Sequence, residues 1–276
     1  QAGALGNNLE FEGQANVDVG GTGTTFNLDT DDTGDLSAVS INFVGDGGAT
    51  LTITGDSDVT LKGVNAGPDI TGAVVVNNNL AAGATLDITG GSPALELDDN
   101  VTTLTVEAGD DNTTLIGTDP AEPGIVSDTL SQINTDTNSN GDAVIDLGVL
   151  AVTSAALAVN GDPAAGAGDT RVEIGDVPDG AAWTFTDAEV VIDDASGIGA
   201  GATINLGAGA TVSGDAPIAD IVPFLAPGSL IPIDSDSTAA EIDSILQSLS
   251  PSAATIDVSD MSSAQLQAIS DNALKV

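Results

Sequence analysis

Apolar and polar residues alternate along most of the chain, from about Gly20 to Gly214. The alternating runs are short, and Gly, Asp or Asn residues separate them. Alternation with a period of two places the apolar side chains on one face, so each run predicts a short β-strand. The clearest runs are TTFNLD, VSINFVG, ATLTITG, VTLKG, AVVVN, ATLDITG, ALELDD, TTLTVEAG, AVIDLG, AALAVNG, TRVEIG, AWTFTD, EVVIDD and ATINLGAGATVSG.

Some of these runs resemble one another. The string GATLTITG at Gly48–Gly55 returns 35 residues later as GATLDITG at Gly83–Gly90, and a weaker copy lies at Gly201–Gly207. Short Thr-rich strands at repeated spacing are typical of a β-solenoid, in which each turn buries its aliphatic side chains against the next. We therefore expect a mainly β fold with a parallel β-helix-like body. A β-sandwich, which shows similar alternation, is the alternative.

Two segments interrupt the strand pattern. Residues 118–141 contain Pro120, Pro123 and the apolar string SDTLSQI, which predict a loop with a short helix. Residues 215–232 contain four prolines, which predict a semi-rigid linker. The sequence thus predicts a strand-rich body over residues 1–214, ahead of that linker.

The C-terminal residues 233–276 have a different pattern. Thr238–Glu241 and Ser262–Gln265 match the capping box, in which a hydroxyl and a later acid or amide satisfy helix-start amides. Each box opens a short amphipathic helix, and the residues between them, Ala254–Ser259, predict a strand. We therefore expect a small α/β segment of strand-helix repeats.

The charge of the chain is strongly one-sided. Asp and Glu number 42 against three basic residues, which gives a formal charge of -39 over 276 residues. Self-repulsion of that size opposes compaction unless salt or bound cations reduce it. Hard divalent cations prefer carboxylate and carbonyl oxygens, so calcium is the expected counter-ion. Nucleic acids and anionic membrane surfaces are excluded as partners, because both are bound through clustered Lys and Arg.

The residue types present also limit the chemistry. Cys, His and Tyr are absent, which excludes thiol nucleophiles, disulfides, Cys/His zinc sites and Ser-His-Asp triads. Two carboxylates could cleave a glycosidic bond, but sugar-cleaving sites usually add aromatic or basic residues. The chain has one Trp, Trp183, and one Arg, Arg171. Trp183 alternates with Phe185 and is expected in the core. We expect no enzyme activity, and no apolar run reaches the roughly 18 residues of a membrane span.

One segment resembles a calcium-binding loop. From Asp136 the sequence DTNSNG follows the start of the pattern D-x-[DN]-x-[DN]-G, with Gly141 at the sharp turn. Position twelve, which usually holds a bidentate Glu, is Leu147. The alternative is an Asx-rich loop with no ion. The predicted ligands are Asp136, Asn138, Asn140, Asp142 and Asp146.

A second acidic cluster, LDTDDTGD, could hold a cation between adjacent turns or subunits, although a solvated acidic turn is favoured. Its carboxylates are those of Asp29, Asp31, Asp32 and Asp35.

The C-terminal strings DSDSTAAEIDSIL and IDVSDMSSAQLQAISDN resemble repeats of very large secreted surface proteins and adhesins of Gram-negative bacteria. The Gly-, Thr- and Asp-rich body is similar in composition to surface-layer proteins and autotransporter passengers. The resemblance implies an exported, calcium-dependent protein with a structural or adhesive role. No G-G-x-G-x-D array is present.

These observations together predict a structural, self-assembling subunit of an extracellular surface layer or filament. Its expected partner is further copies of itself, and calcium is its expected cofactor. Cell-surface polysaccharide is a further candidate partner. The alternatives are an adhesin or spacer stalk, and a β-helix that binds or cleaves carbohydrate.

Overall fold

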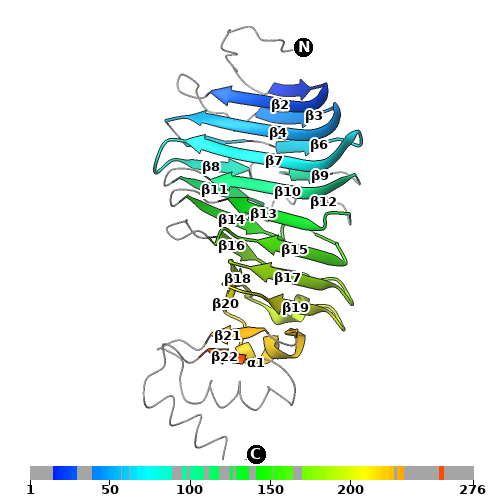
Figure 1. Cartoon of the computed structure of the whole chain (residues 1–276), viewed down its shortest axis with the longest axis vertical. Helices are drawn as coiled ribbons and strands as arrows, with labels where there is room; N and C mark the ends of the chain where they lie inside the picture. The colour runs from blue at the N-terminus through cyan, green and yellow to red at the C-terminus, as the bar shows by residue number, and fades with distance from the viewer. Residues whose placement is uncertain are drawn as a thin grey trace, which may run out of the picture.

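The structure is a computed structural model of the whole chain, shown in Figure 1. It describes residues 15–29, 39–56, 58–61, 63–88, 95–97, 100–108, 112–117, 125–126, 129–136, 141–150, 152–163, 170–226, 229–232 and 255–257.

Three parallel sheets form the walls of a β-solenoid. Sheet A contains β1 (Ala15–Val19), β3 (Val39–Phe43), β6 (Gly63–Ala66), β9 (Leu95–Leu97) and β12 (Ile125–Val126). Sheet B contains β2 (Thr22–Asp29), β4 (Asp46–Gly55), β7 (Ile70–Leu80), β10 (Val101–Ala108), β13 (Gln132–Asp136), β15 (Ala156–Asn160), β17 (Ala182–Thr186) and β19 (Thr203–Leu206). Sheet C contains β5 (Val59–Thr60), β8 (Thr85–Ile88), β11 (Thr113–Ile116), β14 (Asp142–Asp146), β16 (Thr170–Glu173), β18 (Glu189–Val191) and β20 (Thr211–Ser213).

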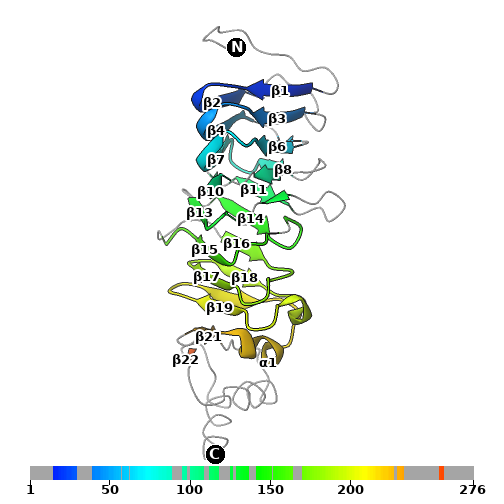
Figure 2. The same cartoon turned by 90° about the vertical axis from the view of Figure 1, so that its right-hand side faces the viewer.

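From β3 to β14 the chain visits these walls in the order A, then B, then C, and from β15 to β20 it alternates between the strands of sheets B and C. Consecutive turns stack along the long axis of the molecule, as Figures 1 and 2 show from two sides. This arrangement confirms the predicted β-solenoid and not the β-sandwich alternative. Beyond β12, a parallel bridge between Val177 and Ile198 lies where sheet A would continue.

The spacing of the turns differs from the spacing of the similar sequence strings. In sheet B, Phe26 pairs with Leu51 and Leu51 pairs with Val76, so one turn there takes 25 residues. The first GATLTITG string lies in β4 of sheet B, whereas Thr85–Ile88 of its copy forms β8 of sheet C. The similarity therefore reflects shared strand and turn chemistry on two walls, and the two strings do not occupy equivalent turns.

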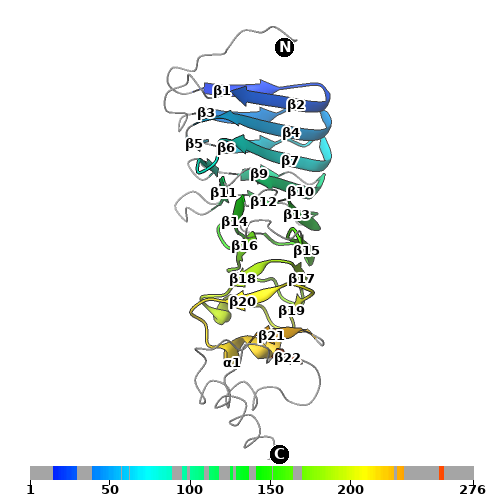
Figure 3. The ribbon, with the colours of Figure 1, turned by 60° about the vertical axis from the view of Figure 1, so that its left-hand side comes forward.

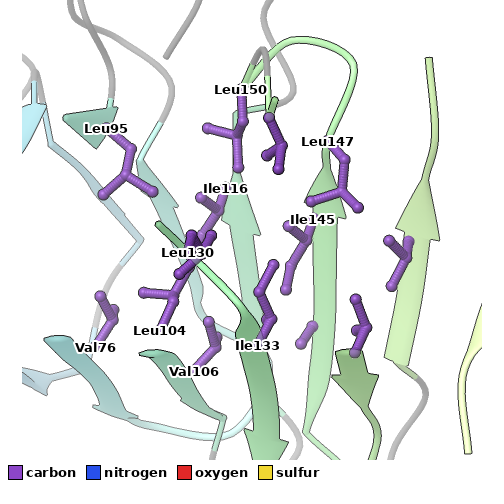
Figure 4. Close-up of a cluster of buried hydrophobic side chains, with 14 of the residues drawn as sticks. Val76, Leu95, Leu104, Val106, Ile116, Leu130, Ile133, Ile145, Leu147 and Leu150 are labelled. Carbon is purple, nitrogen blue, oxygen red and sulfur yellow. The ribbon is translucent and has the colours of Figure 1, made fainter. Parts of the chain in front are cut away.

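The core consists mainly of aliphatic side chains, with a few aromatic ones, stacked in register inside the three walls. Figure 4 shows such side chains converging from different strands into one interior. Complete burial of one aliphatic side chain contributes about 1.5–3 kcal/mol, so a continuous stack is the main stabilising feature of the fold. One buried stack in sheet B is Ala49, Val74, Leu104, Ile133, Val159, Phe185 and Leu206.

Trp183 and Phe185 belong to this core, as the alternation in AWTFT predicts. Their exposed fractions are 1% and 0%. The indole N–H of Trp183 donates to the carbonyl oxygen of Ser154 at 2.8 Å, which satisfies its only polar group.

The described residues of the segment 118–141 continue the solenoid, whereas the sequence predicted a loop with a short helix there. It contains β12 and β13, and none of its described residues is helical. Leu130 and Ile133 come from the string that resembled a helix, and both are buried in the core. Their spacing of three residues arises because Leu130 lies just before β13 and Ile133 lies within it.

The segment predicted as a linker closes the C-terminal end of the solenoid. It forms α1 (Ile218–Ile221) and the 3₁₀ helix η3 (Val222–Phe224). A second 3₁₀ helix, η2 (Ala195–Gly197), lies outside this segment, between β18 and β19. Ile221 and Val222 are buried. Figure 3 shows α1 at the end of the stack opposite β1. The apolar residues between the prolines cover the end of the core, so this segment acts as a cap.

This cap also covers the last strand of sheet B. Leu225 forms a parallel bridge with Ile204, and the N–H of Ala226 donates to the carbonyl of Ile204 at 2.7 Å. The N–H of Leu206 donates to the buried hydroxyl of Ser229 at 3.1 Å. Two backbone groups of β19 that a further strand would use, the carbonyl of Ile204 and the N–H of Leu206, are thus already bonded.

A two-stranded parallel sheet follows the cap. It pairs β21 (Leu230–Pro232) with β22 (Thr255–Asp257), and β22 lies inside the strand that the sequence predicted at Ala254–Ser259. The two predicted C-terminal helices lie outside the described residues.

Candidate cation sites and outer faces

The described ligands of the predicted calcium loop lie on strands of sheets B and C. β13 ends at Asp136 and β14 begins at Asp142, and Asn138 and Asn140 lie outside the described residues. Asp142 and Asp146 are the two ends of β14. A parallel strand rises about 3.3 Å per residue, which separates their Cα atoms by about 13 Å. Two ligands of one calcium ion lie within about 5 Å of each other, so the strand does not bring these two carboxylates together.

Asp146 closes the turn that follows β14. Its Oδ1 atom accepts a hydrogen bond from the N–H of Val149 at 2.9 Å. Burial raises the pKa of the Asp146 carboxyl, and the nearby charge of Glu173 raises it further, whereas hydrogen bonds from the N–H groups of Val149 and Gly148 lower it. The carboxyl of Asp146 therefore holds its proton more tightly than an ordinary Asp.

Glu173 is the neighbour of Asp146 on the adjacent strand, β16, and belongs to an ion cluster on sheet C. The Nε atom of Arg171 contacts Oε1 of Glu173 at 3.1 Å, and its Nη1 atom lies 3.6 Å from Oε2 of Glu189. The hydroxyl of Ser213 donates to Glu189 at 2.6 Å. The side chains of Arg171, Glu173 and Glu189 are 35–40% exposed, so these contacts each contribute at most about 1 kcal/mol.

Sequence reasoning treated Arg171 as an isolated residue and missed this cluster. Arg171 and Glu189 are 18 positions apart, and only the register between β16 and β18 brings them together. The two acidic residues that contact Arg171 come from two neighbouring strands of sheet C, β16 and β18.

The second predicted cation cluster begins at Asp29, the last residue of β2. Its other members, Asp31, Asp32 and Asp35, lie outside the described residues. Among the residues that the structure does describe, no three carboxylates converge closely enough to hold a metal ion. Calcium binding at either predicted cluster stays a prediction.

A ladder of polar side chains crosses the outer face of sheet A. The amide of Asn42 donates to Asp18 at 3.0 Å, and the amide of Asn65 donates to Asn42 at 2.8 Å. The carboxylate of Asp18 can only accept, so it fixes the direction of the ladder. Hydrogen-bonded amide ladders of this kind tie successive strands together.

A second polar cluster is buried at the corner between sheets B and C. Asn78 is fully buried, and its amide donates to the carbonyl of Thr113 at 3.1 Å and to the hydroxyl of Thr114 at 3.0 Å. The N–H of Leu80 donates back to Asn78 at 3.1 Å. The amide of Asn112 donates to the carbonyls of Asn78 and Leu80. This cluster satisfies backbone groups where the chain turns from one wall to the next.

Part of the outer face of sheet B carries no charged residue, whereas the next outward column, towards the C-terminal ends of its strands, holds Glu107 and Asp136 in register. We use the term neutral face for two columns of outward residues in register on its strands. One column is Thr25, Thr50, Val75, Thr105, Asn134, Asn160 and Thr186. The other is Ala73, Thr103, Gln132, Ala158, Thr184 and Asn205.

Four side chains of the neutral face hydrogen-bond to each other. Oδ1 of Asn134 accepts from Gln132 at 2.8 Å and from Asn160 at 3.0 Å, and the hydroxyl of Thr186 donates to Asn160 at 2.9 Å. Figure 1 shows sheet B along the front of the molecule, from β2 to β19. Part of the neutral face is therefore ordered by its own hydrogen bonds, and its two columns carry no formal charge.

No protein-family model matches the chain, and no match is found among curated proteins or solved structures. The β-solenoid fold is compatible with the repetitive surface proteins that the sequence resembles. Within the described ranges, no helix combines the length and apolar character needed to cross a membrane.

Proposed function

We propose that this protein is a structural subunit that assembles with copies of itself into an extracellular surface layer or filament, and that calcium stabilises the assembly. The observation that carries the proposal is the combination of a parallel β-solenoid with a net charge of -39. A solenoid with one continuous core is a stiff element suited to a repeating array. The charge supplies a means of controlling when copies meet.

Repulsion between copies is the barrier that such an assembly must overcome. At physiological ionic strength the Debye length is about 8 Å, so two acidic surfaces repel strongly once they approach contact. Few Lys or Arg residues are present to pair with carboxylates of a neighbour, since the chain has three basic residues. Divalent cations remove this barrier by binding carboxylate oxygens, and extracellular calcium-binding modules do so at about millimolar calcium.

Growth of the array by end-to-end pairing of copies through sheet B is disfavoured, because the cap covers one of the two ends of this sheet. The cap after β19 bonds the carbonyl of Ile204 and the N–H of Leu206, and a further strand would have to displace it. Contacts between the sides of neighbouring solenoids do not require that displacement.

Negative-stain electron microscopy with light scattering tests the proposal. The purified chain is stripped of metal with a chelator and then titrated with calcium, with magnesium and with sodium chloride of equal ionic strength. We expect ordered polymers with calcium that dissolve again in chelator. Monomeric rods under all conditions would contradict the proposal.

A spacer stalk is the second candidate, because the stacked turns make the molecule longer along the solenoid axis than across it (Figures 1 and 2). A stalk needs stiffness but no contact between copies. Rods that stay monomeric in calcium and bind cell-surface polysaccharide would support this alternative, and release of sugar from the polysaccharide would support an enzyme.

A further inference from the structure

We propose that the neutral face of sheet B is the surface through which two copies of this chain contact each other side by side. The inference rests on the proposed function, since it names the contact that a self-assembling subunit would use. It follows from the distribution of charge over the three walls, from the order of the face and from its size.

The first reason is that the other described outward positions carry carboxylates, including Glu107 and Asp136 in the column of sheet B that flanks the neutral face. Sheet C presents Asp87, Asp142, Asp146, Glu173 and Glu189 on its outward positions, with Arg171 as the single base. Sheet A presents Asp18 and Glu96. A tight contact that excludes water from such carboxylates leaves charges buried without partners, which costs several kcal/mol for each one. The two columns of the neutral face avoid that cost.

The second reason is that the neutral face is ordered before contact. Asn134, Asn160 and Thr186 hold each other through the hydrogen bonds described above, and the remaining side chains are short. Side chains that are already fixed lose little conformational entropy when a partner binds. Hydroxyl and amide groups can also exchange their water hydrogen bonds for bonds to the same groups of a second copy.

The size of the face fits a weak contact that repeats in an array. Strands spaced about 4.8 Å apart give the columns a length of about 30 Å, and the two columns with their flanks are about 15 Å wide. The area is then about 450 Å² per copy, or about 900 Å² in total, just below the roughly 1,000 Å² of a specific contact and in the range of weak, transient ones. Such a pair is weak alone and gains strength from cations at its edge, where Glu107 lies in register with Asn77.

A two-fold axis is the simplest arrangement, because both copies then use the same face. Thr105 lies on β10, the fourth of the seven strands in its column. It would lie close to the axis and meet Thr105 of the second copy. The absence of Cys from the chain makes this geometry directly testable by a single introduced thiol.

The first test adds charge to the neutral face. The double variant Thr50→Asp/Thr105→Asp is compared with Thr85→Asp/Thr211→Asp, which adds the same charge to sheet C, and with the uncharged Thr50→Asn/Thr105→Asn. Sedimentation velocity of the full chain in calcium gives the protein concentration at half-association. We expect the sheet B aspartates to raise that concentration about tenfold or more, and the two control variants to change it much less.

The outcomes separate this inference from the proposed function. If wild type assembles and the sheet B aspartates assemble equally well, the neutral face is not the contact although the proposed function stands. Equal weakening by the sheet C aspartates would also overturn the inference, since total charge would then explain the effect. A wild-type chain that never associates would contradict both proposals.

A second test does not depend on folding of the charged variants. Thr105→Cys is compared with Thr211→Cys during mild oxidation in calcium, and covalent dimers are measured by gel electrophoresis without reductant. We expect the Thr105→Cys variant to cross-link and the Thr211→Cys variant to stay monomeric on the gel. The opposite result, or equal cross-linking of both, would overturn the inference.

Discussion

Replacing Asn78 by alanine tests the register of the solenoid at a single strand. The sequence Asn77, Asn78 and Asn79 places three identical residues next to one another in β7, and only Asn78 points into the core. The neighbouring variant Asn77→Ala removes the same side chain from the outer face. The two variants therefore differ in the direction of the side chain and in almost nothing else.

The expected cost follows from the hydrogen bonds of Asn78. Its side chain makes bonds to Thr113, Thr114 and Leu80, at 3.1, 3.0 and 3.1 Å. A buried hydrogen bond contributes about 0.5–1.5 kcal/mol net, so three of them amount to roughly 3 kcal/mol. Leaving the N–H of Leu80 buried without a partner adds to that cost. For Asn77→Ala we expect a change within about 0.5 kcal/mol.

Urea denaturation of the chelated, monomeric protein measures both variants. Far-UV circular dichroism follows the whole solenoid, and the fluorescence of Trp183 follows the later turns, so local loss of β7 is distinguishable from global unfolding. Equal destabilisation by Asn77→Ala and Asn78→Ala would refute the assigned register, because a slip by one residue exchanges the two faces of a strand.

Three further changes test other parts of the fold. Because the pKa of Asp146 is raised in the fold, its contribution to stability is present at pH values below its unfolded pKa and is lost as the pH rises through its folded pKa. Asp146→Asn should therefore raise the melting temperature at pH 7, by an amount that corresponds to a few tenths to about 1 kcal/mol. The gain should be smaller at pH 3, and an equal gain at both pH values would refute the reasoning. Ser229→Ala should cost about 1–3 kcal/mol locally and speed hydrogen exchange of the Leu206 amide, because that N–H loses its buried acceptor; unchanged exchange would contradict the cap. Gly161→Ala should cost about 3 kcal/mol or more in thermal denaturation, since a Cβ there would overlap the carbonyl oxygen of Asp187, and a variant as stable as wild type would disprove that close approach.

The fold was predictable where inward positions are apolar and outward ones polar. The run AWTFT shows this pattern, and the structure buries Trp183 and Phe185 accordingly. The strand β11 does the opposite, since Thr114 points inward to Asn78 while Leu115 is half-buried on the outer face. Hydrophobic alternation could not reveal this strand, because its inward polar group is satisfied by a residue 36 positions away.

Features that depend on register were not predictable from the sequence. Predicting the contact of Arg171 with Glu189, or the bond of Ser229 to Leu206, requires the length of each turn. The similar strings 35 residues apart did not give that length. The neutral face also depends on the register of the strands. Its polar residues were visible in the alternation, but their gathering on one wall appears only when the strands are stacked.

Calcium-dependent association of the metal-free chain is the measurement that tests the central claim most directly. Sedimentation velocity is run on the full chain while calcium is raised to the millimolar range, with sodium chloride of equal ionic strength as the reference. Our account predicts large species with calcium, their disappearance in chelator, and little association with sodium alone. A chain that stays monomeric in calcium, or that associates equally in sodium chloride, would contradict it.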